Sequence, residues 1–247
     1  MLKAPDQLKI LLLQIRDGVQ VRREEHRSFA DYCGIAPEQI DILNVFDTPD
    51  FPLTVTDNYD ALFVGGASEA NVLQPDQYPF VAQCQQLLRH CADNGKPVFA
   101  SCFGFQLAVL ALGGEILSKD VGFEMGTLPI TLTDAAADDQ LYHDTQNGFH
   151  AVSVHRQYAE EVPQSCQVLA YTDECIHSFK VKGKPFWAFQ FHPEVDRATL
   201  VERLTFYKAH YTDGDDQLDR VLDSAVDTPE SNVLVRKFVE RILLAGE

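Results

Sequence analysis

The feature that most constrains the fold is the segment at residues 96–114, KPVFASCFGFQLAVLALGG. A short apolar run at 97–100 predicts a buried strand, and the apolar run at 105–112, which ends at two glycines, predicts a helix. Cys102 lies between them, so the pattern predicts a strand–turn–helix with a thiol at its apex, the layout of a nucleophile elbow. The N-terminus of such a helix carries partial positive charge and stabilises an anion such as a thiolate. Gly104 suits this turn, because a side chain there would crowd the crossing of strand and helix.

A second motif gives this thiol a chemical context, since an isolated cysteine is most simply a small buried hydrophobic residue. Apolar and aromatic residues at 185–191 predict another strand, and His192, Pro193 and Glu194 follow it. His192 and Glu194 are two positions apart at a strand end, where alternate side chains point the same way. Glu194 is therefore expected to hold one ring nitrogen of His192 while the other nitrogen faces the thiol. That is the nucleophile–base–orienting-group arrangement of a catalytic triad.

The two motifs, F-x-x-C-F-G-F-Q and about 90 residues further along Q-F-H-P-E, together resemble those of the class I (triad-type) glutamine amidotransferases. The resemblance covers nearly the whole chain and is greatest to free-standing domains related to the glutaminase part of GMP synthase. It implies an α/β fold of the flavodoxin-like type, a three-layer sandwich with a central, mostly parallel sheet and a small antiparallel flap. It also implies one domain over residues 1–247, with 195–247 as a C-terminal helical extension packed on it.

The resemblance also implies a role for each residue that matches the family pattern. Cys102 is the nucleophile, His192 the base and Glu194 its partner, while the backbone amides of Gly66 and Phe103 form the oxyanion hole. The remaining substrate-binding positions are Gly65, Ser68, Gln106, Arg156, Gln157 and Tyr158. The chain departs from the pattern at four positions: Ala67 replaces Pro, Ser68 replaces Gly, Ala100 replaces Gly and Phe105 replaces the His of many members.

Two of these positions also have a simpler structural interpretation. Gly65-Gly66 follows an apolar strand at 61–64, where ligands collect in open α/β sheets, although an isolated Gly-Gly is more often a plain tight turn. His155 precedes the three implied pocket residues and is more simply a structural hydrogen-bonding residue than a catalytic one. His177 is most simply a residue on one face of a strand.

The rest of the chain is consistent with an α/β domain. The pattern predicts strands at 8–15, 39–46 and 61–64, helices at 22–33 and 78–92, and a hairpin of 175–182 with 185–191 that turns at Gly183. Short alternating segments at 115–118, 126–132, 150–154 and 167–171 predict the antiparallel part, and 134–144 an exposed acidic connection. The tail is expected to be helical, with a break at 211–216 that lacks the Glu and spacing of a calcium loop.

Composition excludes several classes of function. The net charge of -17 disfavours binding to nucleic acid or an anionic membrane. The 6 cysteines show no C-x-x-C pair and no metal-ligand spacing, so we expect no metal site, no disulfide framework and a reducing cytoplasmic setting. The apolar run at 10–13 is too short for a signal peptide or a membrane span. The expected chemistry requires no cofactor.

Three functions remain open from the sequence. The first is a glutaminase that releases glutamate and ammonia, with the ammonia passed to a separate synthase partner. The second is a γ-glutamyl peptidase or hydrolase that acts on small γ-glutamyl conjugates and releases a bulkier amine. The third is a catalytically silent binding or regulatory protein, which the intact Cys102, His192 and Glu194 disfavour.

Overall fold

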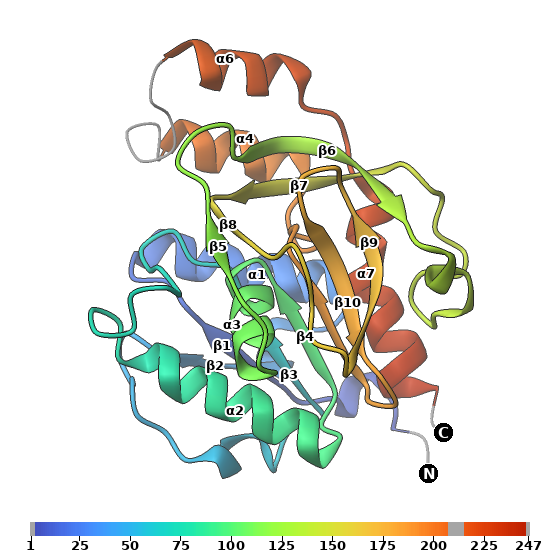
Figure 1. The fold of residues 1–247 in the computed structure, drawn as a ribbon. Helices are drawn as coiled ribbons and strands as arrows, with labels where there is room; N and C mark the ends of the chain where they lie inside the picture. Colours follow the sequence, from blue (N-terminus) through green and yellow to red (C-terminus); the bar gives the residue numbers. More distant parts are fainter. Residues whose placement is uncertain (1–2, 207–214, 246–247) are drawn as a thin grey trace.

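The computed structural model describes residues 3–206 and 215–245 of the chain. At its centre lies one mixed sheet in the order β2-β1-β3-β4-β11-β10-β9-β6-β7 (Figure 1). The strands are β1 (Ile10–Gln14), β2 (Ile40–Asn44), β3 (Ala61–Val64), β4 (Val98–Ser101), β6 (Glu124–Leu132), β7 (Phe149–His155), β9 (Cys166–Tyr171), β10 (Ile176–Val181) and β11 (Phe186–Phe189). From β2 to β11 neighbouring strands are parallel, and from β11 to β7 they are antiparallel. A separate antiparallel pair joins β5 (Leu117–Ser118) to β8 (Gln157–Tyr158).

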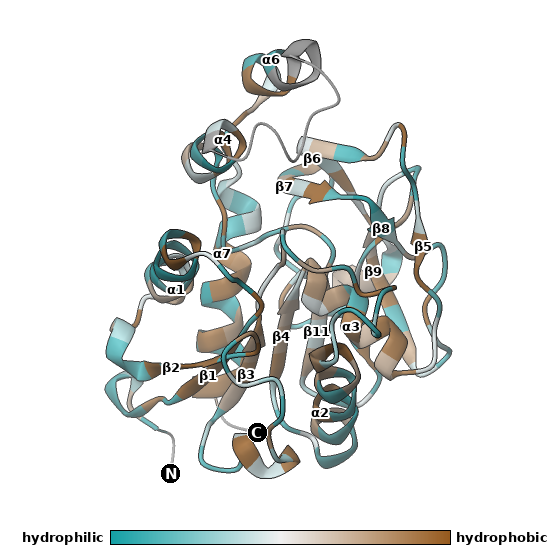
Figure 2. Ribbon diagram, turned by 90° about the vertical axis from the view of Figure 1, so that its left-hand side faces the viewer, coloured by the Kyte–Doolittle hydropathy of each residue, from teal (hydrophilic) through white to brown (hydrophobic). Residues whose placement is uncertain are grey.

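Helices cover both faces of the parallel half. Figure 2 shows its apolar strands between α1 (Val19–Cys33) and α7 (Pro229–Phe238) on one side and α2 (Phe80–Asn94) and α3 (Phe103–Ala111) on the other. A π-helical turn, η5 (Val239–Leu244), extends α7, and short 3₁₀ turns lie at η1 (Pro5–Gln7), η2 (Pro37–Gln39), η3 (Leu53–Thr56) and η4 (Asp134–Asp138). The predicted three-layer α/β sandwich is therefore confirmed.

The continuous apolar run of β1 explains its central place. Leu11 and Leu13 pack in the core beneath α2 and α3, whereas Ile10 and Leu12 pack in the core beneath α1 and α7. Alternate side chains of a strand point to opposite faces, so a strand covered on both faces needs apolar residues at every position. The predicted strand at 8–15 is confirmed for the same reason.

Glycines end the elements where the sequence predicts. Gly34 and Gly95 follow α1 and α2 in the left-handed conformation, with φ of 70° and 68°, and Gly183 turns the β10–β11 hairpin with φ of 69°. A side chain at such a φ is strained, which is why glycine is favoured there.

The prediction of an exposed connection at 134–144 is wrong in part. Asp139 is buried, and Trp187 donates its indole Nε1–H to both of its carboxylate oxygens, at 3.2 and 3.1 Å. Leu141 and Tyr142 are buried beside it. An acidic residue can enter a core when a donor satisfies it, and composition alone does not reveal that donor.

The C-terminal helices divide between two parts of the sheet. α4 (Arg197–Phe206) and α6 (Asp215–Ser224) enclose a small core with β6 and β7, formed by Met125, Val152, Leu200, Leu204 and Val221. Leu234, Val235 and Phe238 of α7 join the main core. Most of the predicted break at 211–216 lies outside the described residues. No helix among those described combines the length and apolar character needed to cross a membrane.

Candidate active site

Cys102 occupies the predicted elbow between β4 and α3. Its backbone has φ 50° and ψ -101°, and it is the one non-glycine residue with positive φ among those the structure describes. Its amide donates to Phe189 O at 2.7 Å, which anchors the turn to β11. Gly104 makes the close crossing possible, because a Cβ there would lie 2.9 Å from both Cβ and the backbone oxygen of Val64. The strained backbone thus projects the thiol from the N-terminus of α3.

His192 and Glu194 form a buried pair beside this thiol. Nδ1 of His192 lies 2.7 Å from Oε1 of Glu194, and the imidazole also hydrogen-bonds Cys102. Burial disfavours the charged ring, but the negative charges of Cys102 and Glu194 outweigh it and raise the pKa of His192 to about 9. Burial also opposes ionisation of Glu194, yet His192 reverses this effect and lowers its pKa. The geometry supports an ion pair of thiolate and imidazolium.

The backbone around His192 is held by two distant elements. The His192 amide donates to Val152 O of β7 at 2.8 Å. Asn232 of α7 donates its Nδ2 to the backbone oxygens of Pro193 and Val195, at 2.8 and 3.0 Å. The C-terminal helix therefore fixes the turn that carries both His192 and Glu194, a function that its apolar stripe does not reveal.

Gly66 lies against the same three-residue group. A Cβ added to it would lie 2.7 Å from Cε1 of His192 and 3.5 Å from Cβ of Cys102, so only glycine fits without displacing the ring. On the other side of the thiol, Phe103 is the first residue of α3, and its amide has no partner within the helix. The two amides predicted for an oxyanion hole thus come from segments that meet at Cys102.

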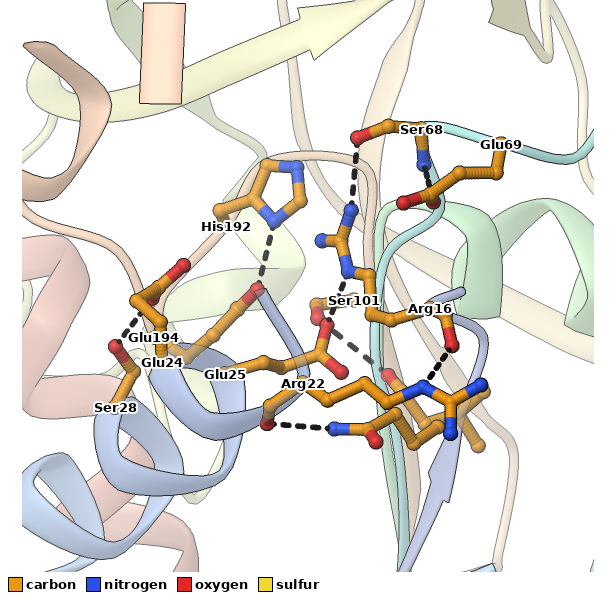
Figure 3. A network of polar contacts seen from close by, with 12 residues as sticks. Arg16, Arg22, Glu24, Glu25, Ser28, Ser68, Glu69, Ser101, His192 and Glu194 are labelled. Atoms are coloured by element: carbon orange, nitrogen blue, oxygen red, sulfur yellow. Dashed lines mark hydrogen bonds and ion pairs between the residues drawn. The ribbon is translucent and has the colours of Figure 1, made fainter. Parts of the chain in front are cut away.

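A buried ion pair supports the loop that carries Gly66 (Figure 3). Arg16 donates Nε–H to Oε1 of Glu25 at 2.9 Å and Nη1–H to Oγ of Ser68 at 2.9 Å. Gly65 leaves space for this pair, since a Cβ there would lie 2.5 Å from Oε1 of Glu25. Burial raises the pKa of Glu25, and Arg16 opposes that rise. Arg16 and Glu25 were not predicted, although Arg16 follows β1 at the same sheet edge as Gly65, where functional residues gather.

A cavity of ≈ 210 Å³ opens in front of Cys102. Of the residues predicted to bind substrate, Ser68, Gln106, Arg156 and Gln157 line it together with Cys102 and Phe103. Gln106 donates Nε2–H to Gln157 O at 3.1 Å, which joins α3 to the opposite wall. Phe123 and Val154 add an apolar side, and the guanidinium of Arg156 lies 4.0 Å from the Phe123 ring centroid.

The other predicted residues lie around this cavity. Tyr158 lines a neighbouring hollow with Glu124 and Arg156, and Gly65 lies behind the loop against Glu25. Phe105 is buried against Phe179, with ring centroids 5.3 Å apart, so the departure at this position serves the core. Ala67 lines the cavity, and Ala100 is buried in β4.

Comparison with known proteins decides the family. Residues 39–209 match the family model described as "Glutamine amidotransferase class-I". The chain belongs to the class-I glutamine amidotransferases. The sequence resemblance is therefore confirmed at the level of the family.

This amidotransferase has relatives of more than one stated activity. It is 32% identical over 112 residues to the glutamine-hydrolyzing subunit of a GMP synthase from Methanocaldococcus jannaschii, over 43% of this chain and 57% of that protein. It is 28% identical over 144 residues to a γ-glutamyl-L-1-hydroxyisopropylamide hydrolase of a Pseudomonas species, over 56% of this chain and 48% of that protein. The chain thus spans about half the length of these curated relatives.

A solved structure shares the fold of the amidotransferase over nearly its full length. The glutamine amidotransferase of Thermotoga maritima aligns with a TM-score of 0.71 at 16% identity and covers 97% of this chain and 99% of that one. At this identity the likeness establishes the fold alone. It agrees with the flavodoxin-like architecture predicted from the sequence.

Proposed function

We propose that this amidotransferase hydrolyses the side-chain amide of glutamine, or of a closely related γ-glutamyl amide, with Cys102 as nucleophile. The observation that carries the proposal is the His192–Glu194 pair, 2.7 Å apart and buried, whose imidazole hydrogen-bonds a cysteine at a helix N-terminus. This arrangement holds a thiolate ready beside a protonated ring, which is what acyl transfer from a poor leaving group requires.

The first half of the reaction forms a thioester. The thiolate of Cys102 attacks the γ-carbonyl carbon, and the amides of Gly66 and Phe103 stabilise the oxyanion of the tetrahedral intermediate. Imidazolium His192 gives its proton to the leaving nitrogen, so that ammonia departs as the C–N bond breaks. Glu194 keeps the ring oriented and stabilises its positive charge.

The second half releases glutamate. Neutral His192 takes a proton from water, and the resulting hydroxide adds to the thioester carbon at the same oxyanion hole. Collapse of this intermediate breaks the C–S bond and restores the thiolate with protonated His192. The cycle consumes one amide and one water, and yields one carboxylate and one ammonia. None of its steps changes an oxidation state.

The same site also supports a γ-glutamyl hydrolase that releases a larger amine. Phe123 and Val154 give the cavity an apolar side next to Cys102, where a substituent on the leaving nitrogen would be desolvated. The Pseudomonas relative is named for a γ-glutamyl amide with a hydroxyisopropyl group on its nitrogen. For the glutaminase alternative, the Methanocaldococcus relative is named as one subunit of a synthase, which favours a separate partner that receives the ammonia.

The test is glutamate release from glutamine and from a panel of γ-glutamyl amines, measured for the wild type, Cys102→Ala and the control Cys166→Ser. Loss of the nucleophile should lower kcat by about 10⁴-fold or more, as in other triads. Cys166 lies on β9 away from the cavity, so its variant should keep the wild-type rate. A preferred substituted amine would select the hydrolase. Equal turnover by Cys102→Ala and the wild type would refute the proposal.

A further inference from the structure

We propose that a second cluster of side chains, formed by Glu124, His155, Cys175 and His177, binds a divalent transition-metal ion of the zinc type. The residues come from the start of β6, the end of β7, and the start of β10 with the residue before it. Each offers one ligand atom, and these four atoms all lie within 4.8 Å of one another. This proposal does not depend on the proposed amide hydrolysis.

The distances match a tetrahedral site that is slightly contracted. Oε2 of Glu124 lies 3.0 Å from Nε2 of His155, 2.8 Å from Nε2 of His177 and 3.4 Å from Sγ of Cys175. A zinc ion with bonds of about 2.0–2.3 Å to its four ligands separates them by about 3.3–3.8 Å. Side-chain movements of a few tenths of an ångström would therefore admit the ion at the centre of the cluster.

The hydrogen bonds of His155 indicate that a cation belongs there. Its Nδ1 lies 3.1 Å from Gln157 O, and a carbonyl oxygen can only accept, so Nδ1 carries the proton. In the neutral ring, Nε2 then presents a lone pair to the carboxylate oxygen of Glu124, which is also an acceptor. This Nε2 is buried and makes no hydrogen bond within the described chain. Two lone pairs that face each other in a buried site repel unless a positive charge lies between them.

The donor set suits zinc. One thiolate, two imidazoles and one carboxylate are ligands that Zn²⁺ accepts, and the two anionic groups neutralise its charge, which favours binding in a buried site. Cys175, His155 and His177 are 6%, 7% and 0% exposed, so the site is closed and its ion would be structural. Thr172 donates to Oε1 of Glu124 at 2.8 Å and orients the carboxylate from outside, as second ligand spheres commonly do.

The ion would stabilise one wall of the candidate active site. Gln157 O receives hydrogen bonds from His155 Nδ1 and from Gln106 Nε2, so the residue that contacts the metal also fixes the backbone that borders the cavity. The sequence predicts no metal site because its cysteines lack local ligand spacing. Here, however, antiparallel pairing of β6 with β7, and of β9 with β6 and β10, assembles ligands that are far apart in the chain.

The experiment uses the full chain with Cys102→Ala, so that the catalytic-type Cys, His and Glu cannot form a competing thiolate site. Protein purified without chelators is analysed for metals by mass spectrometry and then reconstituted with Co²⁺. We expect about one equivalent of metal, and a Co²⁺ spectrum with d–d bands and a thiolate-to-metal charge-transfer band. Addition of Cys175→Ser should abolish the charge-transfer band, while the matched buried thiol variant Cys166→Ser should retain it.

Each outcome is decisive. Fewer than about 0.1 equivalents of metal in folded protein, with no Co²⁺ spectrum after reconstitution, would overturn the proposal in favour of a protonated His155. Persistence of the charge-transfer band in Cys175→Ser would also overturn it. If Cys175→Ser fails to fold, the metal content and Co²⁺ spectrum of the parent decide, together with its thermal denaturation. A chelator should lower the Tm of the parent when the ion is structural, and an unchanged Tm would contradict a structural ion.

Discussion

Two clusters of the same residue types lie within this molecule, and they are arranged for different chemistry. In the first, Cys102, His192 and Glu194 form a line in which each nitrogen of His192 has its own partner. In the second, His155, His177 and Cys175 all converge on one oxygen of Glu124. A line of groups moves a proton, whereas convergent donors surround an ion. Residue type alone therefore does not define a site, and the direction of each lone pair does.

The surroundings sharpen this contrast. Cys102 has a strained backbone at a helix N-terminus and opens into a cavity, so its thiolate can reach a substrate. Cys175 lies on the way into β10, and burial together with the nearby Glu124 carboxylate raises the pKa of its thiol. A thiol in that setting needs a metal ion, rather than a neighbouring imidazole, to become an anion.

The largest expected difference between the two clusters concerns their thiols. Cys102→Ala should reduce glutamate release by about 10⁴-fold or more, while Cys175→Ser should reduce it far less and mainly lower the Tm. Steady-state kinetics at a temperature well below both melting transitions would separate the effects. Equal loss of kcat in the two variants would break the distinction between a reacting thiol and a ligand thiol.

The two glutamates provide the next comparison. Glu194→Gln should lower kcat by about 10²–10⁴-fold with little change in KM, because the amide can no longer stabilise the imidazolium. Glu124→Gln removes a carboxylate that contacts no reacting atom, so it should lower metal content and raise KM while kcat changes less. Kinetic constants measured with metal analysis on the same samples test this split. A larger kcat effect for Glu124→Gln would contradict it.

The buried ion pair behind the first cluster should have a measurable effect on stability. Arg16→Met leaves Glu25 buried without its main partner, which should lower the free energy of unfolding by about 3–5 kcal/mol. The control Arg89→Met removes an exposed pair with Asp93 and should cost less than about 1 kcal/mol. Denaturant unfolding of both variants gives the comparison. Similar losses would show that Arg16 contributes no more than a surface charge.

The smallest effect concerns pH. His192 has its pKa raised from 6.5 to about 9, so the imidazolium that protonates the leaving group is present below that value and is lost as pH rises through it. The ratio kcat/KM should therefore fall by about tenfold per pH unit above the midpoint. In Glu194→Gln the midpoint should move to lower pH, because one of the charges that raise the pKa is gone. An alkaline limb that does not move in this variant would argue against that assignment.

The sequence predicted the local parts of this structure well. The strand and helix around Cys102, the strand at Ala61–Val64 and the turn at Gly183 follow from apolar runs and glycines within a few residues of each other. The family resemblance added the fold and nominated His192, Glu194 and Gly66, which the structure brings together around Cys102. Their catalytic roles remain the proposal that the experiments above test.

Contacts between distant elements could not be predicted in the same way. Arg16 and Glu25 lie on different elements, and nothing in their local pattern marks them as a buried pair beneath a loop near residue 66. Asp139 looked like part of an exposed acidic stretch until the fold placed Trp187 against it. Glu124 meets Cys175 and His177 only through antiparallel strand register, which no short motif encodes.

The most direct test of the central claim is covalent labelling by a glutamine analogue with a diazoketone in place of the amide. Intact-protein mass spectrometry followed by peptide mapping would count and locate the adducts on the 6 cysteines. The account predicts one adduct per chain, at Cys102, that free glutamine suppresses and that Cys102→Ala abolishes. Labelling at Cys175 instead, or no labelling of the folded wild type, would contradict the assignment of Cys102 as the nucleophile.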